Sequence, residues 1–500
     1  MKRRLAGLAL LSGTLVLLAA APAGARERTI KVSTPSGPCP ASVACNKVEV
    51  RQIGPVGAKK VLVLIPGTQG GVGDFTLMAR ELVKQVRGLQ VWSVDRRTQI
   101  LEDTSVFKAT LATAKKPLSV RKKALSKAFC YYLNFFDSSC EHIDLRDETA
   151  DGSWAQNLGA AVALNDVHAV VKLARSQGRK VVLGGHSLGG GLASQYAAWD
   201  FAGKPGYSFI DGLVLIDGGG KSENETSTAA AATCSLNGQT PVDPTDPSTT
   251  CTGSANPLAT QPWLRLVGSG LPAASAGLFA EVGALYAKLD PQGSGETLRT
   301  FSILPAAFNP GFRVTNRGLF GFAFDRDTAP AGLALLHVNS GQLKPGGGAG
   351  SAKPCDWVDG GVTPVSRLAG TFGQEPNNAV EWYFPRRLSV DSGYGSSLNQ
   401  TAAEDGEAED LLGLRVWHGS DIDVPVYAIR TDLGGGDLTS VQRLLTFAGI
   451  AGSKATLVNA STAALGASNG QSHLDPLLGS PSRNRLYPTL VPFLKKKAFR

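Results

Sequence analysis

The sequence predicts an α/β fold: a mostly parallel central sheet flanked by helices, with a large inserted cap domain. Three observations lead to this prediction. Short aliphatic runs alternate with amphipathic helical stretches from about residue 60 to residue 219, which is typical of a parallel sheet covered on both faces. A glycine-bounded turn joins one of these runs to a helix at Gly185-His186-Ser187-Leu188-Gly189. The alternation then stops for roughly two hundred residues and resumes near Val424.

Each predicted element follows from its local pattern. Lys60–Ile65 is a continuous aliphatic run, as expected for a strand that is buried on both faces, and the other predicted strands are short, mainly apolar runs. The helices show apolar residues on one face, such as Leu77, Met78 and Leu82. The predicted strands are Lys60–Ile65, Leu89–Val94, Lys180–Gly184, Gly212–Asp217 and Val424–Ile429, and the predicted helices are Asp74–Val86, Asn157–Arg175, Gly190–Ala198 and, in the cap, Ala276–Leu289.

The chain is expected to divide into a leader, a core in two parts and the cap. Residues 1–25 read as a secretory signal peptide: a basic start (Lys2, Arg3, Arg4), an apolar run and an A-x-A cleavage site that ends at Ala25. The apolar run is short for a membrane span, so a stable span is not expected. The remaining parts are 26–220, the first part of the core with an insertion at about 99–149; 221–409, the inserted cap or lid; and 410–500, the second part of the core.

Composition and charge are those of an ordinary globular protein. Of the 500 residues, 43% are hydrophobic and 18% are charged. The formal charge of +9 falls to +6 when Lys2, Arg3 and Arg4 leave with the signal peptide. The basic residues read as scattered apart from 495–497, so no nucleic-acid partner is expected. No phosphate-binding glycine motif and no metal-ligand spacing occur in the sequence, so no cofactor and no metal are expected.

Seven cysteines in an exported chain suggest disulfides. Proximity in the sequence gives three candidate pairs, Cys39 with Cys45, Cys130 with Cys140 and Cys234 with Cys251, and leaves Cys355 over.

The most informative motif is the G-x-S-x-G turn at Ser187. Between a buried strand and a helix of small residues, this pattern is typical of a nucleophile elbow, in which a strained turn exposes the serine hydroxyl at the end of the sheet. The helix behind it favours a developing negative charge at its N-terminus. The sequence therefore predicts that Ser187 is a catalytic nucleophile.

A nucleophilic serine needs a base, and the expected order along the chain is Ser, Asp or Glu, then His. His473 follows every predicted strand and lies in a glycine-rich polar loop, so it is the predicted base. His186 lies inside the turn with its side chain pointing away from the nucleophile, His337 lies in the cap, and His418 precedes the last predicted strand.

The carboxylate that orients this histidine is less clearly marked. Asp432 follows the last predicted strand, and the pattern favours it. Asp437 lies five positions further on in the same loop, and Asp217 follows the preceding strand, so both are alternatives. Each of these aspartates could instead be a helix cap or a turn residue.

An oxyanion hole requires two backbone N–H groups directed at the developing charge. One is expected from Leu188, the residue after the nucleophile. The other is expected from the loop after Lys60–Ile65, where Thr68 or Gln69 would donate.

Together these motifs resemble the α/β-hydrolase superfamily, and its secreted lipase and esterase branches most. The stretches that carry the resemblance are GHSLGG at 185–190, Asp95-Arg96-Arg97 after a strand, Ser472-His473-Leu474-Asp475 and the pair Asp432 and Asp437. The resemblance covers about residues 61–219 and 424–494 and implies an acyl-serine hydrolase with Ser187, Asp432 and His473 as its triad. The family's usual His-Gly before the oxyanion loop is Pro66-Gly67 here, and the cap resembles no family.

The predicted function is a secreted esterase or lipase that acts on a small-molecule or lipid ester. Two alternatives stay open: a peptidase or amidase with the same triad, for which Glu375, Glu381, Glu404 or Asp405 could hold a peptide amine, and a non-catalytic binding protein of the same fold. One or two of five cap aromatics are expected to line the acyl pocket, namely Phe320, Phe322, Phe324, Trp382 and Tyr383. The sequence does not determine the acyl chain, the alcohol or the oligomeric state.

Overall fold

The computed structural model describes residues 26–500 apart from 36, 41–42, 44, 136, 147–153, 222–233, 236–249, 252–261, 266–270, 302–308, 345–352, 375–378, 397 and 399–411. The predicted signal peptide, 1–25, therefore lies outside the described residues. Among the described residues, we find no helix with the length and apolar character needed to cross a bilayer.

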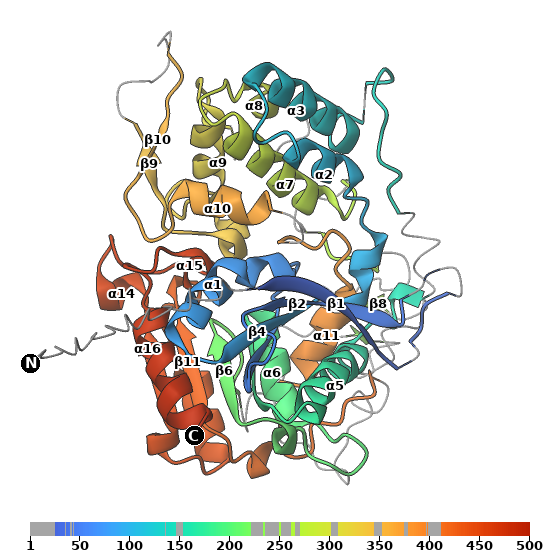
Figure 1. Ribbon diagram of the computed structural model, residues 1–500, viewed down its shortest axis with the longest axis vertical. Coiled ribbons are helices and arrows are strands. Elements are labelled where there is room, and N and C mark those ends of the chain that lie inside the picture. Colours follow the sequence, from blue (N-terminus) through green and yellow to red (C-terminus); the bar gives the residue numbers. More distant parts are fainter. Residues whose placement is uncertain are drawn as a thin grey trace, which may run out of the picture.

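The centre of the molecule is a mostly parallel eight-stranded sheet (Figure 1). Two antiparallel ladders, β1 with β2 and β2 with β4, form one edge, and every other neighbouring pair is parallel. This arrangement confirms the predicted fold class. In spatial order the strands are β1 (Glu27–Ser33), β2 (Lys47–Ile53), β4 (Leu89–Val94), β3 (Lys60–Ile65), β5 (Lys180–His186), β6 (Gly212–Ile216), β11 (Val426–Arg430) and β12 (Ala455–Asn459).

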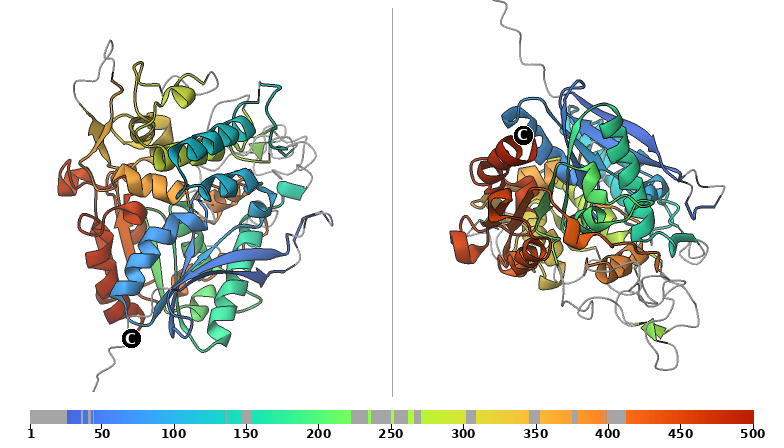
Figure 2. Two further views of the ribbon diagram at one scale, coloured as in Figure 1. Left: turned by 45° about the horizontal axis from the view of Figure 1, so that its top comes forward. Right: turned by 90° about the horizontal axis from the view of Figure 1, so that it is seen from below.

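Helices cover both faces of this sheet because its strands are apolar on both sides. Alternate residues of β3 enter two different cores: Leu62 and Leu64 pack on one face, and Val61 and Val63 on the other. Figure 2 shows these layers from two further directions. The first face is covered by α1 (Thr76–Gln85) and α16 (Leu486–Phe493), and the second by α5 (Ala160–Ser176), α6 (Leu188–Ala198) and α13 (Thr439–Phe447).

The two predicted insertions meet in space. Helices α2 (Ser105–Leu111) and α3 (Leu118–Tyr132) come from the first, and α7 (Ser275–Leu289) comes from the second. They share one hydrophobic cluster, in which Phe107 and Tyr132 join Leu278 and Trp382. The two segments therefore form one body above the carboxyl ends of the parallel strands (Figure 1).

The rest of the inserted region divides between this upper body and the sheet. Helix α11 (Arg386–Tyr394) packs beside α5 and α6, with Leu388 in the core of the sheet's second face. The other elements of the region are α8 (Glu296–Arg299), α9 (Asn316–Phe324), β9 (Gly341–Leu343), β10 (Trp357–Asp359) and α10 (Val365–Phe372). Short helices α14 (Thr462–Leu465) and α15 (Asp475–Leu478) flank the loop before the C-terminal helix.

Two of the three predicted disulfides are present, Cys39–Cys45 and Cys130–Cys140. Cys234 and Cys251 lie opposite each other in the ladder of β7 (Cys234–Ser235) and β8 (Thr250–Cys251). Their side chains lie outside the described part, so the third disulfide stays a prediction. Cys355 is buried.

Candidate active site

The turn at Ser187 has the strained backbone that its sequence predicts. Ser187 adopts φ 55° and ψ −125°, a conformation that residues with a Cβ rarely adopt, and its N–H donates to the carbonyl of Ile216 at 2.9 Å. A Cβ on Gly185 would lie 2.1 Å from the carbonyl oxygen of Gly189, and a Cβ on Gly189 would lie 2.0 Å from that of Ile65. Only glycine fits at both positions, and the half-buried serine is held between β5 and α6.

His473 lies in the loop between α14 and α15, and its carboxylate partner is Asp217. The Nδ1 atom of His473 lies 2.5 Å from Oδ2 of Asp217, and both side chains are buried. Asp217 comes directly after β6, at φ 46°, and it also accepts hydrogen bonds from the backbone N–H and the hydroxyl of Thr431. Burial by itself would raise the pKa of Asp217, but the hydrogen bond and positive charge of His473, together with the bonds from Thr431, lower it to about 2.

The structure does not bring the favoured acid, Asp432, to His473. The carboxylate of Asp432 instead accepts hydrogen bonds from the N–H and the hydroxyl of Thr462, each at 2.6 Å, and forms an ion pair with Arg326 at 2.9 Å. These contacts fix the loop after β12, which leads towards His473. The sequence favoured Asp432 over Asp217 as the acid that orients His473. In the structure Asp217, and not Asp432, contacts His473, so the geometry favours Asp217.

The other candidate side chains have structural partners. Asp437 is exposed just before α13 and accepts hydrogen bonds from the N–H and hydroxyl of Thr439. His418 binds Asp200 at 3.0 Å, and the Nε2 atom of His337 lies 3.1 Å from the carbonyl oxygen of Pro330.

The loop after β3 lies beside the serine and is fixed from behind by Arg96. A Cβ on Gly67 would lie 2.9 Å from the Cβ of Ser187. Arg96 donates to the carbonyl oxygens of Pro66 and Gly67 at 2.8 Å and to that of Gly70 at 2.9 Å. The N–H and C=O of a trans peptide point in opposite directions, so the N–H of Thr68, which shares a peptide with the carbonyl of Gly67, points away from Arg96.

The neighbouring residue, Gln69, is hydrogen-bonded to residues of the inserted region. Its carbonyl accepts from the N–H of Glu381 at 2.8 Å, and its amide Nε2 donates to the carbonyl of Leu264 at 3.1 Å. The other expected donor, the N–H of Leu188, is at the first position of α6, where no intrahelical acceptor exists. These contacts involve the carbonyl and the side chain of Gln69 and not its backbone N–H, so Thr68 and Gln69 both stay candidate donors.

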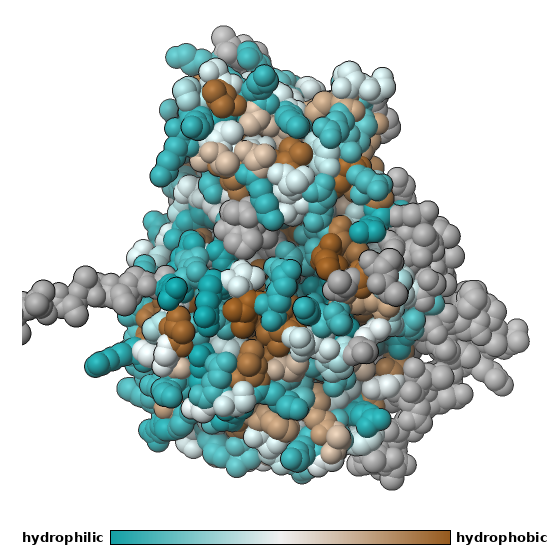
Figure 3. All heavy atoms as spheres, turned by 45° about the vertical axis from the view of Figure 1, so that its right-hand side comes forward, coloured by the Kyte–Doolittle hydropathy of each residue, from teal (hydrophilic) through white to brown (hydrophobic). Residues whose placement is uncertain are grey.

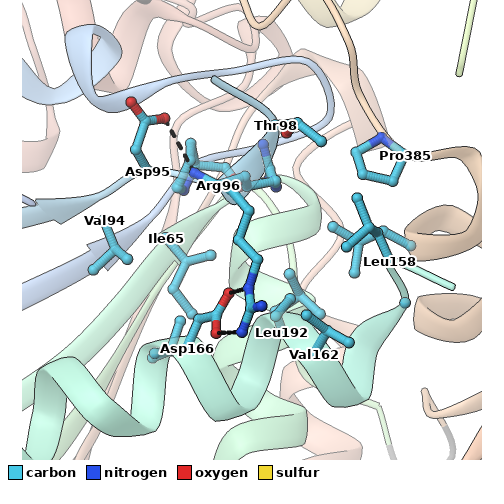
Figure 4. A pocket seen from close by; sticks show the side chains of 16 residues that line it. Ile65, Val94, Asp95, Arg96, Thr98, Leu158, Val162, Asp166, Leu192 and Pro385 are labelled. Carbon is cyan, nitrogen blue, oxygen red and sulfur yellow. Dashed lines mark hydrogen bonds and ion pairs between the residues drawn. The ribbon is translucent and has the colours of Figure 1, made fainter. Parts of the chain in front are cut away.

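A buried ion pair holds Arg96 in this position. Its Nη1 atom lies 2.6 Å from Oε2 of Glu381, and the hydroxyl of Thr98 donates to the other carboxylate oxygen. Burial raises the pKa of Glu381, and the charge of Arg96 opposes that effect. The next residue, Arg97, turns the other way and binds Asp166 through two hydrogen bonds, marked by the dashed lines at Asp166 in Figure 4. The sequence indicates this arginine pair only by its resemblance to a family motif, because the partner of Arg96, Glu381, lies 285 residues away.

The pocket drawn in Figure 4 is lined in part by Arg96, and Ser187 is not among its lining residues. Its apolar wall is formed by β3, α5, α6 and α11 through Ile65, Val162, Leu192 and Leu388. It therefore lies behind the loop after β3 rather than in front of it.

Two other cavities meet at Ser187. One, of about 340 Å³ including its mouth, is lined by His473 and the loop 67–70 on one side and by Phe372 and Val380 of the upper body on the other. The second, of about 700 Å³ including its mouth, lies over α6 and is lined by Leu188, Gly219 and α11. Ser187 is therefore shared by the linings of both cavities, and the larger one lies over α6.

The five aromatics expected at the pocket line neither of these cavities. Four of them are buried: Phe320 and Phe324 pack with Phe372, and Trp382 and Tyr383 belong to the cluster of α3 and α7. Phe322 is partly buried against the same core as Phe320. The aromatic residue that does line the smaller cavity, Phe372, carried no signal in the sequence beyond its apolar character.

Comparisons with known proteins give structural likenesses alone. No model of a protein family matches the chain, and no curated protein matches it in sequence. A candidate lipase from Sulfolobus solfataricus is 14% identical over 95% of both chains, with a TM-score of 0.46. An epoxide hydrolase from an endophytic Streptomyces is 13% identical over 95% of this chain and 96% of that one, with a TM-score of 0.38. An esterase from Thermogutta terrifontis is 11% identical over 94% and 98%, with a TM-score of 0.36.

Among the described residues, no group of three or more His, Cys, Asp or Glu side chains is placed to hold a metal ion.

Proposed function

We propose, with the α/β-hydrolase fold of this chain as the premise, that the protein is a serine hydrolase of carboxylic esters. The observation that carries the proposal is that Ser187, His473 and Asp217 lie together at one cavity or directly beside it. The strained turn presents Ser187 at the carboxyl ends of the strands, and the buried pair of His473 and Asp217 lines or adjoins the same cavity. This is the set of residue types that acyl transfer to a serine requires.

Each residue then has one role. His473 takes the proton of the Ser187 hydroxyl as the oxygen attacks the ester carbonyl, and it later gives that proton to the leaving alcohol. Asp217 holds the imidazole with Nδ1–H directed towards its own carboxylate, so that Nε2 is free to act as the base. The N–H groups of Leu188 and of Thr68 or Gln69 stabilise the oxyanion. Water resolves the acyl-enzyme by the same steps in reverse.

The larger cavity beside Ser187, over α6, supports an ester with one substantial arm. No observation favours the amidase alternative. Of the four carboxylates that could hold a peptide amine, Glu381 is already paired with Arg96, and the other three lie outside the described residues. A binding protein without catalysis would have no need for a buried His–Asp pair beside a strained serine.

Two disulfides and the signal-peptide pattern at 1–25 support an extracytoplasmic location, which we include in the proposal.

The test combines labelling and turnover. We expect a fluorophosphonate probe to label the protein at Ser187 and p-nitrophenyl esters to be hydrolysed, with aminoacyl anilides cleaved slowly or not at all. Ser187→Ala should abolish labelling and lower kcat by about 10⁴-fold or more. A folded Ser187→Ala variant that keeps more than about a tenth of the activity would contradict the assignment.

A further inference from the structure

A helical hairpin of the upper body carries a dense local positive charge. We call residues 105–132, which comprise α2, α3 and the turn between them, the basic hairpin. It contains seven lysines and arginines and no aspartate or glutamate, whereas the whole chain without its signal peptide has a formal charge of only +6. The expectation that the basic residues are scattered is therefore wrong for this segment.

The structure presents this charge to solvent. The inner face of α3 is buried: Leu125 and Ala128 lie in the core of the upper body, and Tyr132 packs edge-on against Trp382. The outer face carries the lysines. The Nζ atom of Lys122 lies 3.7 Å from a carboxylate oxygen of Asp290, and that of Lys127 lies 3.9 Å from one of Glu141. Both lysines are exposed, and ion pairs of exposed lysines contribute little to stability. The exposed lysines without an ion pair to any described residue are Lys115, Lys116 and Lys123.

Apolar groups lie among these lysines. Leu118 and Val120, at the start of α3, are 43% and 45% exposed, which is unusual for side chains of their size in this protein. Between α2 and α3 runs a groove of about 540 Å³ including its mouth, with a mainly apolar wall. The groove is lined by Ser105, Val106, Ala109, Thr110, Ala124 and Lys127. In Figure 3 the upper body likewise presents hydrophobic patches interspersed among hydrophilic side chains.

The hairpin is also held rigidly. The disulfide Cys130–Cys140 closes its C-terminal end, and the hydroxyl of Tyr131 donates to the carboxylate of Asp103 at 2.6 Å. A ligand that binds the outer face therefore does not have to order the hairpin first.

We propose that the basic hairpin docks the protein onto the surface of an anionic lipid bilayer. Lysines beside exposed apolar side chains and an apolar groove match such a surface, because headgroup phosphates meet the ammonium groups while Leu118 and Val120 enter the interface. The apolar features would contribute nothing to phosphate contacts along a nucleic acid, so the observations favour lipid over nucleic acid. This surface is separate from Ser187, and the proposal does not rest on the proposed function.

The experiment is co-sedimentation of the protein with vesicles. We expect binding to vesicles of equal parts phosphatidylcholine and phosphatidylglycerol, little binding to phosphatidylcholine alone, and release by salt. Each lysine near an anionic surface contributes about fivefold in affinity. The triple variant Lys115→Gln/Lys116→Gln/Lys123→Gln should therefore weaken binding by about 100-fold. A matched control, Lys59→Gln/Lys495→Gln/Lys496→Gln, removes the same charge from exposed sites elsewhere and should leave binding within about threefold.

A second variant separates lipid from other polyanions. Leu118→Ser/Val120→Ser should weaken vesicle binding by on the order of tenfold and leave the affinity for duplex DNA unchanged. The proposal is overturned if the lysine control weakens vesicle binding as much as the hairpin variant does, or if the serine variant binds vesicles normally. It is also overturned if the protein binds DNA through the hairpin lysines but does not bind anionic vesicles. Hydrolysis of a water-soluble ester should be the same in all these variants, so this outcome is independent of the catalytic assignment.

Discussion

The imidazole rings of His186 and His473 pack against each other with their centroids 4.3 Å apart, and Nε2 of His186 lies 2.9 Å from the carbonyl oxygen of His473. A carbonyl only accepts, so Nε2 of His186 carries the hydrogen. The residue before the nucleophile thus holds the backbone of the predicted base. His186 is buried, and that burial, followed by the charge of His473, lowers its pKa to about 3.

This contact predicts a pH-dependent stability. The pKa of His186 in the unfolded chain is 6.5, and in the folded protein it is about 3. Between these values the unfolded chain binds a proton that the folded protein does not, so the free energy of unfolding falls as the pH falls, by at most about 1.4 kcal/mol per pH unit. His186→Phe removes this titration and also leaves the carbonyl of His473 without its donor, which costs about 1–3 kcal/mol. Urea unfolding of the parent and of His186→Phe at pH 8 and pH 5 measures the free energy of unfolding of each. The parent should exceed the variant by less at pH 5 than at pH 8. An equal excess at both pH values would contradict a neutral, buried His186.

The contact between Asp217 and His473 predicts which aspartate matters for turnover. Asp217→Asn should lower kcat by about 10⁴-fold, because an amide in this place no longer holds the imidazole in the required tautomer. Asp432→Asn removes an ion pair with Arg326 far from Nδ1 of the histidine and should leave kcat within about tenfold of the parent. The measurement is kcat for one p-nitrophenyl ester, with circular dichroism to confirm folding. If Asp432→Asn is the more damaging substitution, the acid has been assigned wrongly.

A third prediction concerns the arginine behind the oxyanion loop. Arg96→Lys keeps the charge but cannot bind Glu381 and three carbonyls at once, so the N–H donor of the loop after β3 should lose its alignment. We expect kcat to fall by about 10²-fold, similar to the loss of one oxyanion donor, with a matching loss of affinity for a boronic acid that mimics the tetrahedral state.

The neighbouring arginine provides the control. Arg97 is as buried as Arg96 and pairs with Asp166, but it does not contact the oxyanion loop. Arg97→Lys should lower the stability to urea without a comparable loss of boronic acid affinity. Equal losses in the two variants would show that Arg96 acts through general stability alone.

A fourth prediction tests whether the upper body positions the base. Arg326 donates to Asp432, to the hydroxyl of Thr462 and to the carbonyl of Gly470, and so fixes the segment that leads to His473. Arg326→Met should lower kcat by up to about 100-fold with a smaller effect on KM, since small displacements of a catalytic group are costly. The control Arg317→Met breaks a comparable pair with Asp356 within the upper body and should leave kcat nearly unchanged. Arg326→Lys should have a higher kcat than Arg326→Met. If it does not, and if Arg326→Met and Arg317→Met lower kcat equally, Arg326 does not position His473.

The sequence by itself determined the features that depend on neighbouring residues. The strands Lys60–Ile65 and Leu89–Val94 were predicted with the bounds that the structure gives them, because each is a short, mainly apolar run bounded by glycine or charge. The turn at Ser187 could also be predicted from neighbouring residues, because its glycines are required by contacts within the turn and with the adjacent strand.

Only the tertiary structure decided which side chains meet. Asp217 and Asp432 both follow strands at the same edge of the sheet, and the sequence offers no measure of which one the loop from β12 approaches. The path of that loop is fixed by Arg326 and Asp432, and the oxyanion loop is fixed by Glu381, from segments more than a hundred residues away. The cap aromatics were misjudged for the same reason: an apolar side chain suits a pocket and a core equally well, and only packing against its neighbours decides between them.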